Sequence, residues 1–233
     1  MYCFIGNSHL HQFNINGYRS QTGHQIDTIE CTGASIKGLV NLNSKLQVVP
    51  MIKEYQSKNP SSTFIFFLGQ VDLDFGYYFK CVKDGTKHDI HAYIDNLIGL
   101  YETFLSNDIT NPFCVLGINP SVIRDIRHNF NVSFHCPNGK DGFYSEIGQG
   151  IQFEDVKYIY SDSLETRCAY TKMFNKALEE MCKRRNFKFI DISPVLFDGN
   201  VLKSKYVPVN EMDHHLKLTT DTDMIEFIFA RLA

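Results

Sequence analysis

The sequence predicts an α/β protein in which a parallel sheet of about five strands lies between two layers of helices. Two observations favour this class: short, continuously apolar segments alternate with longer segments of helical period, and turn residues separate the two kinds. Strands without polar alternation are typical of a sheet that is buried on both faces. The segments that fit are residues 2–5, 26–31, 63–68, 113–116 and 187–192.

The segments between these strands carry apolar residues at the spacing of a helix. The clearest stripe recurs at steps of four, three, four and three residues and consists of Ile90, Ile94, Leu97, Tyr101 and Phe104. Two more helices are expected, over about 162–184 and about 220–232, and a capping box of Asp162 and Glu165 marks the start of the first. Strands that alternate with such helices indicate right-handed βαβ units, and therefore a three-layer α/β/α sandwich of the flavodoxin-like kind.

Residues from about 121 to 161 interrupt this rhythm. They lack a sustained helical period and contain several glycine- and asparagine-rich turn signals. We expect an irregular insertion over the carboxyl edge of the sheet, with a small hairpin as one option; a functional lid and a disordered segment are both open. A chain of 233 residues suits one domain with such an insertion, so residues 1–233 are expected to form a single domain.

The composition argues against two classes of partner. The formal charge is -3 and the isoelectric point is near 6.3, whereas a protein that binds nucleic-acid phosphates needs a basic face. The apolar runs are far too short to span a bilayer, and the first residues have no signal-peptide pattern. The seven cysteines have no C-x-x-C spacing, which is typical of reduced thiols. We therefore expect a cytoplasmic protein that binds neither nucleic acid nor membrane; the oligomeric state is left open.

Small and polar residues follow the predicted strands, at the edge of a parallel sheet where ligands bind. Residues 6–9 (Gly-Asn-Ser-His) follow the first strand, 34–38 (Ala-Ser-Ile-Lys-Gly) the second and 69–72 (Gly-Gln-Val-Asp) the third, and 210–216 precede the last helix. A serine hydroxyl is a poor nucleophile at neutral pH unless a base lies within hydrogen-bond reach and a carboxylate orients that base. The placement therefore predicts that Ser8 meets a histidine from the C-terminal segment.

Taken in order, these segments resemble the SGNH (GDSL-like) hydrolase superfamily, in which a Gly-Asp-Ser block after the first strand supplies the nucleophile. Here Gly6-Asn7-Ser8 stands in that place. The second block implies that the Gly38 N–H joins the backbone N–H of Ser8 in an oxyanion hole. The resemblance implies an esterase or O-acyltransferase that forms an acyl-enzyme on Ser8 and uses neither cofactor nor metal. Its substrates are expected to be small-molecule or glycan esters, with a tilt toward carbohydrates.

Two blocks depart from the family pattern. The third usually gives an asparagine side chain to the oxyanion hole, but Val71 holds that position and only the neighbouring Gln70 carries an amide. The fifth usually reads Asp-x-x-His. Asp213 lies two residues before His215, and this pair is favoured as orienting carboxylate and base. The alternative pairs His214 with Glu211, three residues earlier.

Three further residues are candidates for substrate contacts: His9, Asp72 and Arg167. Each site residue also has a structural alternative, since Ser8 and Asp72 suit helix caps and the glycines suit turns. Two other functions stay open. One is a binding module for a glycan or a protein that has lost catalysis, which Val71 favours; the other is a phosphate binder that uses residues 6–9.

Overall fold

The computed structural model describes residues 1–134, 150–198, 201–211 and 213–232. The five expected strands form one parallel sheet in the order β2-β1-β3-β4-β5. Their bounds are Tyr2–Gly6 (β1), Ile26–Glu30 (β2), Thr63–Phe67 (β3), Phe113–Leu116 (β4) and Lys188–Ile190 (β5). This strand order is that of the flavodoxin-like class, so the predicted fold class is confirmed.

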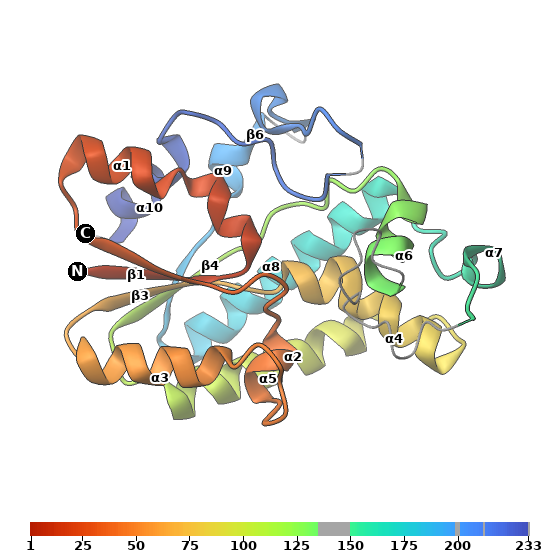
Figure 1. Ribbon diagram of the computed structural model, residues 1–233, viewed down its shortest axis with the longest axis horizontal. Helices are drawn as coiled ribbons and strands as arrows, with labels where there is room; N and C mark the ends of the chain where they lie inside the picture. Colours follow the sequence, from red (N-terminus) through yellow and green to blue (C-terminus); the bar gives the residue numbers. More distant parts are fainter. Residues whose placement is uncertain (135–149, 199–200, 212, 233) are drawn as a thin grey trace.

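Helices cover both faces of the sheet (Figure 1). One layer consists of α1 (Ile15–Thr22), α9 (Ser193–Leu196) and α10 (Asp223–Leu232). The opposite layer consists of α2 (Ile36–Val40), α3 (Val48–Lys58), α5 (Ile90–Asp108) and α8 (Leu164–Arg185). Helix α4 (Tyr77–Asp84) extends past the sheet toward α6 (Ile126–Phe134) and α7 (Phe153–Val156). The smaller elements are 3-10 helices at Ser8–Phe13 and Ser204–Tyr206, a π-helical turn at Asp72–Gly76, and the hairpin of β6 (Phe197–Asp198) and β7 (Val201–Leu202).

The central strands show why their sequences are continuously apolar. Successive side chains of a strand point to opposite faces, yet the neighbours Ile65 and Phe66 of β3 are both fully buried. Both faces of the sheet are therefore covered by helices. The edge strand β2 is different, because Asp27 and Glu30 are exposed there. None of the helices in the described part of the chain is long and apolar enough to cross a membrane.

The segment 121–161 is less irregular than expected. Residues Ile126–Phe134 form helix α6 and Phe153–Val156 form the short helix α7. Phe130 and Phe134 are buried, and their ring centroids lie 5.2 Å apart. Two apolar residues four apart on a helix bury one face, and that short stripe is the signal that the sequence reading missed. The turn signals at 137–142 lie outside the described residues, and the small hairpin stays a prediction.

The capping box expected at the start of α8 is not formed. Ser163 is the N-cap, and its Oγ accepts the backbone N–H of Thr166 at 3.1 Å. Asp162 instead accepts hydrogen bonds from the Tyr78 hydroxyl at 3.1 Å and from the Lys87 ammonium at 2.6 Å. Serine and aspartate both suit an N-cap. The tertiary contacts of Asp162 therefore leave Ser163 as the N-cap of α8.

Candidate active site

Ser8 lies directly beyond the carboxyl end of the central strand β1. A Cβ atom on Gly6 would lie 2.6 Å from the carbonyl oxygen of Phe67, so only glycine fits where the strand ends. Asn7 then caps the 3-10 helix, because its Oδ1 accepts the backbone N–H of His9 at 3.0 Å. The chain leaves β1 toward β2 on one side and returns to β3 on the other. Ser8 therefore lies at the switch point where such sheets bind ligands.

The segment 213–216 brings a histidine to the same place from the other end of the chain. The Asp213 Oδ1 accepts the backbone N–H of His215 at 2.9 Å, which forms a tight turn. Leu216 is buried in the core and anchors the segment. The backbone N–H of Lys217 donates to the carbonyl of Tyr206 at 2.9 Å. The orientation of His215 thus follows from local hydrogen bonds and one apolar anchor.

Ser8, His215 and Asp213 form a continuous chain of hydrogen bonds. The Ser8 Oγ lies 2.8 Å from His215 Nε2, and His215 Nδ1 lies 3.0 Å from Asp213 Oδ1. A carboxylate only accepts, so the proton of neutral His215 belongs on Nδ1 and the lone pair of Nε2 faces the serine hydroxyl. This is the tautomer in which an imidazole can take a proton from serine.

Two more imidazoles surround His215. The ring centroid of His9 lies 4.6 Å from that of His215, and the ring of His214 lies 4.0 Å from it. Burial lowers the pKa of His9 well below its ordinary value, and the neighbouring His215 adds to this. Burial also lowers the pKa of His214 to about 4, with a further contribution from His215. Both neighbours are therefore neutral near pH 7, and His215 has no adjacent histidine cation.

A small cavity opens beside the serine. Its volume is about 200 Å³, and it is lined by Ser8, His9, His11, Gln12, Asp213, His215, Leu216 and Leu218. Gln12 is fixed there, because its amide exchanges two hydrogen bonds with the buried amide of Asn119, at 3.0 and 2.6 Å. The cavity thus has walls from both ends of the chain and contains the candidate nucleophile and base.

Comparison with known proteins places the fold. No protein-family profile matches the chain, and no curated protein matches its sequence. Solved structures match over nearly its whole length. Est24, a carbohydrate acetylesterase from Sinorhizobium meliloti, is 11% identical with a TM-score of 0.50, and the match covers 100% of this chain and 99% of that one. A proposed lipolytic protein of the G-D-S-L family from Desulfitobacterium hafniense is 12% identical with a TM-score of 0.50, over 97% and 96% of the two chains.

The chain has the SGNH hydrolase fold. The resemblance inferred from the ordered blocks is confirmed at this level. At such low identity the comparison establishes the architecture and leaves the chemistry to the geometry of the site.

Two residues assigned to the oxyanion hole have other partners in this SGNH fold. The backbone N–H of Gly38 donates to Ser35 Oγ at 3.1 Å, as in the first turn of a capped helix. The side-chain amide of Gln70 donates to Asp74 Oδ2 at 2.6 Å. Within the described residues, the backbone N–H of Ser8 makes no hydrogen bond. Of the three donors expected, only Ser8 N–H is thus free for an oxyanion.

The position that usually carries asparagine in the third block offers no side-chain donor either. Val71 is buried in a small apolar cluster with Phe75 and Ile123. No side-chain donor therefore extends from this position toward Ser8.

Asp72 and Arg167 do not line the cavity beside Ser8, and their expected contacts with substrate stay predictions. Asp72 is buried and accepts the backbone N–H groups of Ile36 at 2.7 Å and Lys37 at 3.3 Å, which holds the start of α2. Burial raises the pKa of Asp72 to about 6, although these hydrogen bonds oppose the shift. Arg167 is also buried and donates to the carbonyl oxygens of Asp162 and Ile123. Both side chains thus bond to the backbone of the scaffold.

The alternative pair of His214 and Glu211 is not assembled. The Glu211 side chain is 71% exposed and lies 3.8 Å from Arg124. The His214 ring packs edge-on against Phe75, with centroids 5.2 Å apart. The structure therefore favours His215 with Asp213.

A metal ion would compete with the hydrogen-bond chain. Within the described residues, one group has metal-binding side chains close together: Asp213, His214 and His215, whose ligand atoms lie within 4.8 Å of one another. Both ring nitrogens of His215 already have partners, in Ser8 and Asp213. An ion bound there would displace at least one of them.

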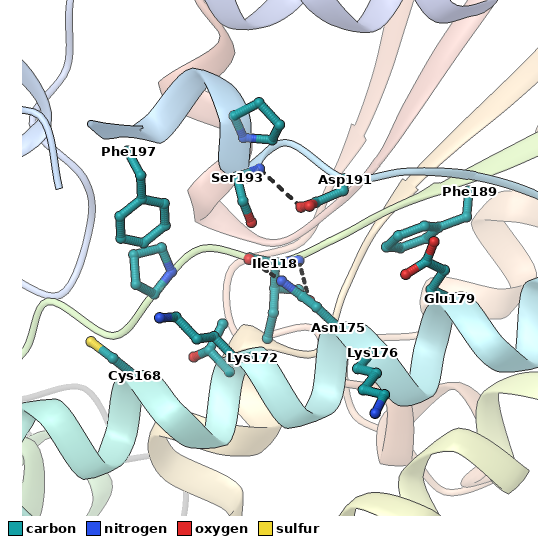
Figure 2. A pocket seen from close by; sticks show the side chains of 13 residues that line it. Ile118, Cys168, Lys172, Asn175, Lys176, Glu179, Phe189, Asp191, Ser193 and Phe197 are labelled. Carbon is teal, nitrogen blue, oxygen red and sulfur yellow. Dashed lines mark hydrogen bonds between the residues drawn. The ribbon is translucent and has the colours of Figure 1, made fainter. Parts of the chain in front are cut away.

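A larger cavity lies apart from the serine, between α8 and the segments that follow β4 and β5. Its volume is about 520 Å³, and it shares no lining residue with the cavity beside Ser8. Figure 2 shows the Asn175 side chain bridging the backbone N–H and C=O of Ile118, at 2.8 and 2.9 Å. Lys172 extends toward Phe197, whereas Lys176 points away from the centre of the cavity. The bonds of Asn175 tie α8 to the loop after β4.

Proposed function

We propose that this chain is a serine-dependent ester hydrolase or O-acyltransferase that forms an acyl-enzyme on Ser8. The observation that carries the proposal is the hydrogen-bond chain from Ser8 Oγ to His215 Nε2, at 2.8 Å, and from His215 Nδ1 to Asp213 Oδ1, at 3.0 Å. Those distances lie within the range for a nucleophile, its base and an orienting carboxylate.

The arrangement assigns each residue a step. Ser8 Oγ attacks the ester carbonyl carbon while its proton passes to His215 Nε2, and Asp213 stabilises the imidazolium that forms. The backbone N–H of Ser8 donates to the oxyanion. When the tetrahedral intermediate collapses, the ester C–O bond breaks and the leaving alcohol takes the proton from His215. Water or an acceptor hydroxyl then attacks the acyl-enzyme with the same base, which releases the acid or the new ester and restores Ser8.

The proposed substrates are small acylated molecules, with acylated carbohydrates as the first class to test. The cavity beside Ser8 is only about 200 Å³ in volume, which favours a short acyl group such as acetyl. Polar side chains line it, among them His11 and Gln12. The structural neighbour Est24 is described as a carbohydrate acetylesterase, and that description supports the same class here.

Labelling with a fluorophosphonate probe tests the proposal without knowledge of the substrate. The wild-type protein is expected to be labelled at Ser8, and Ser8→Ala and His215→Ala to remain unlabelled. Ser20→Ala is the matched control, since Ser20 is exposed on α1 and its hydroxyl donates only to the carbonyl of Gly17. Equal labelling of wild type and Ser8→Ala would contradict the assignment.

The second candidate is a binding module that has lost catalysis. It is favoured by the missing side-chain donors, because Val71 is apolar and Gln70 is held by Asp74. Removal of one oxyanion donor typically slows acyl transfer by about 10²–10³-fold. Absence of labelling in the wild type, together with binding of an acetylated saccharide in calorimetry, would support the module and contradict the enzyme.

A further inference from the structure

A third imidazole is buried beside the proposed catalytic pair and takes no part in the steps above. His9 follows Ser8 directly in the sequence and is only 2% exposed. Its ring centroid lies 4.6 Å from that of His215 and 5.6 Å from that of His214. A buried polar ring needs hydrogen-bond partners, and the identity of those partners indicates its role.

Both ring nitrogens of His9 face oxygen atoms. Nδ1 lies 2.9 Å from Asn7 Oδ1, and Nε2 lies 3.2 Å from the backbone carbonyl oxygen of His214. That carbonyl belongs to the peptide bond immediately before His215. The contact therefore joins the 3-10 helix that carries the nucleophile to the segment that carries the base.

The single proton of neutral His9 can serve only one of these two oxygen atoms. A neutral imidazole has one N–H to donate. Asn7 Oδ1 already accepts the backbone N–H of His9 at 3.0 Å. In the described part of the chain, no backbone N–H donates to the His214 carbonyl. A proton on Nε2 would give that carbonyl a donor, whereas a proton on Nδ1 would give Asn7 Oδ1 a second one at 2.9 Å.

We infer that His9 is a positioning residue, whose Nε2–H holds the His214 carbonyl and thereby sets the His215 ring within reach of Ser8. Its second contribution is steric, since the His9 ring packs against one side of the His215 ring. The catalytic consequence of this inference rests on the proposed function. The structural consequence, an ordered segment 213–216, does not.

Two amide substitutions separate the nitrogens of the ring. In His9→Gln the side-chain nitrogen reaches the place of Nε2, whereas in His9→Asn it reaches only the place of Nδ1. Both replace an aromatic ring by an amide, so a general loss of packing affects them alike. We expect His9→Gln to keep fluorophosphonate labelling and p-nitrophenyl acetate hydrolysis within about threefold of wild type. We expect His9→Asn to lose about tenfold or more in kcat with little change in KM, because a mispositioned base affects the chemical step.

Hydrogen exchange tests the positioning even if the protein has no esterase activity. The amides of residues 213–216 are expected to exchange faster in His9→Asn and at the wild-type rate in His9→Gln. His91→Asn is the control, since His91 is exposed near the start of α5 and does not line the cavity beside Ser8. If His9→Asn does not fold, His9→Phe takes its place, because it retains an aromatic ring and has no donor.

The outcomes separate the two proposals. Failure of the wild type to be labelled, with the exchange pattern as expected, contradicts the esterase and retains the positioning role. Labelled wild type with His9→Gln and His9→Asn equal in both rate and exchange overturns the role of the Nε2–H bond. An equal loss of activity and of exchange protection in both variants would also overturn the role of the Nε2–H bond, because His9 would then act through packing alone.

Discussion

Replacing Asp213 by asparagine removes one charge from the proposed triad and almost nothing else. Asp213 Oδ1 accepts two hydrogen bonds from His215, from the backbone N–H at 2.9 Å and from Nδ1 at 3.0 Å. Asparagine has the same shape and retains an oxygen for the backbone N–H. The turn that orients His215 is therefore preserved, while the stabilisation of the imidazolium is lost.

The size of the effect follows from distance and exposure. When the Ser8 proton moves to His215, a cation forms 3.0 Å from the carboxylate. At that separation two unit charges attract by about 1.4 kcal/mol in water and about 5.5 kcal/mol at an effective dielectric constant near 20. The side chains of His215 and Asp213 are 29% and 44% exposed, so solvent partly screens the pair. We therefore take their attraction as about 3 kcal/mol, between the two limits. This corresponds to a loss of about 100-fold in kcat/KM, less than the ~10⁴-fold expected for a fully buried aspartate.

The rate constant for fluorophosphonate labelling and kcat/KM for p-nitrophenyl acetate measure this loss. The matched control is Glu211→Gln, which neutralises an acidic side chain two residues earlier that is 71% exposed. We expect this control to stay within twofold of wild type. Unchanged rates in Asp213→Asn, or a large loss in Glu211→Gln, would refute the electrostatic reasoning.

Three further substitutions test the site and its scaffold. His215→Ala is expected to abolish labelling and His214→Ala to keep most of it, because the His214 contact with His9 uses the backbone carbonyl; the reverse result would move the base to His214. Burial raises the pKa of Asp74 to about 6. Between about pH 4 and 6 the folded protein therefore retains a proton that the unfolded chain releases. The free energy of unfolding of the wild type falls as pH rises through this window. The Asp74→Asn variant has no such titration, so in urea unfolding it is expected to be up to about 3 kcal/mol more stable than the wild type at pH 7.5 and equally stable near pH 4. Parallel curves of stability against pH for the two proteins would argue against a raised pKa. Arg167→Met is expected to lower the free energy of unfolding by about 2–4 kcal/mol, since two buried carbonyls lose a charged donor, without changing KM; a raised KM at native stability would return Arg167 to substrate binding.

The sequence predicted the sheet well because its strands are buried on both faces. The observed bounds of β1, β3 and β4 agree with the apolar runs to within about one residue. Helix α6 was missed for the opposite reason. Its apolar stripe is short, and Phe130 packs against Phe153 and Tyr160, which come from later in the chain. Contacts of this kind leave no local period to read.

The approach of Ser8 to His215 was predictable, since strand order brings the carboxyl ends of parallel strands to one edge. The oxyanion hole was not, yet signals against it were present in the sequence. Ser35 lies three residues before Gly38, the spacing of an N-cap side chain and the backbone N–H that donates to it. Gln70 and Asp74 lie four residues apart, the spacing at which two helical side chains meet.

The hydrogen-bond chain of the proposed site is assembled in the structure, whereas the side-chain donors expected for its oxyanion hole are not. Ser8, His215 and Asp213 lie at hydrogen-bonding distances from one another along the chain. The buried ring of His9 packs against the ring of His215. The side of the third block is closed by apolar packing around Val71. In the proposed reaction, proton transfer depends on the hydrogen-bond chain and oxyanion stabilisation on the oxyanion donors. Loss of one side-chain donor relative to the family pattern is expected to slow the proposed acylation by about 10²–10³-fold. With few oxyanion donors, the proposed enzyme would rely on the placement of its base, and the contact between His9 and the His214 carbonyl is where the His9 substitutions test that placement.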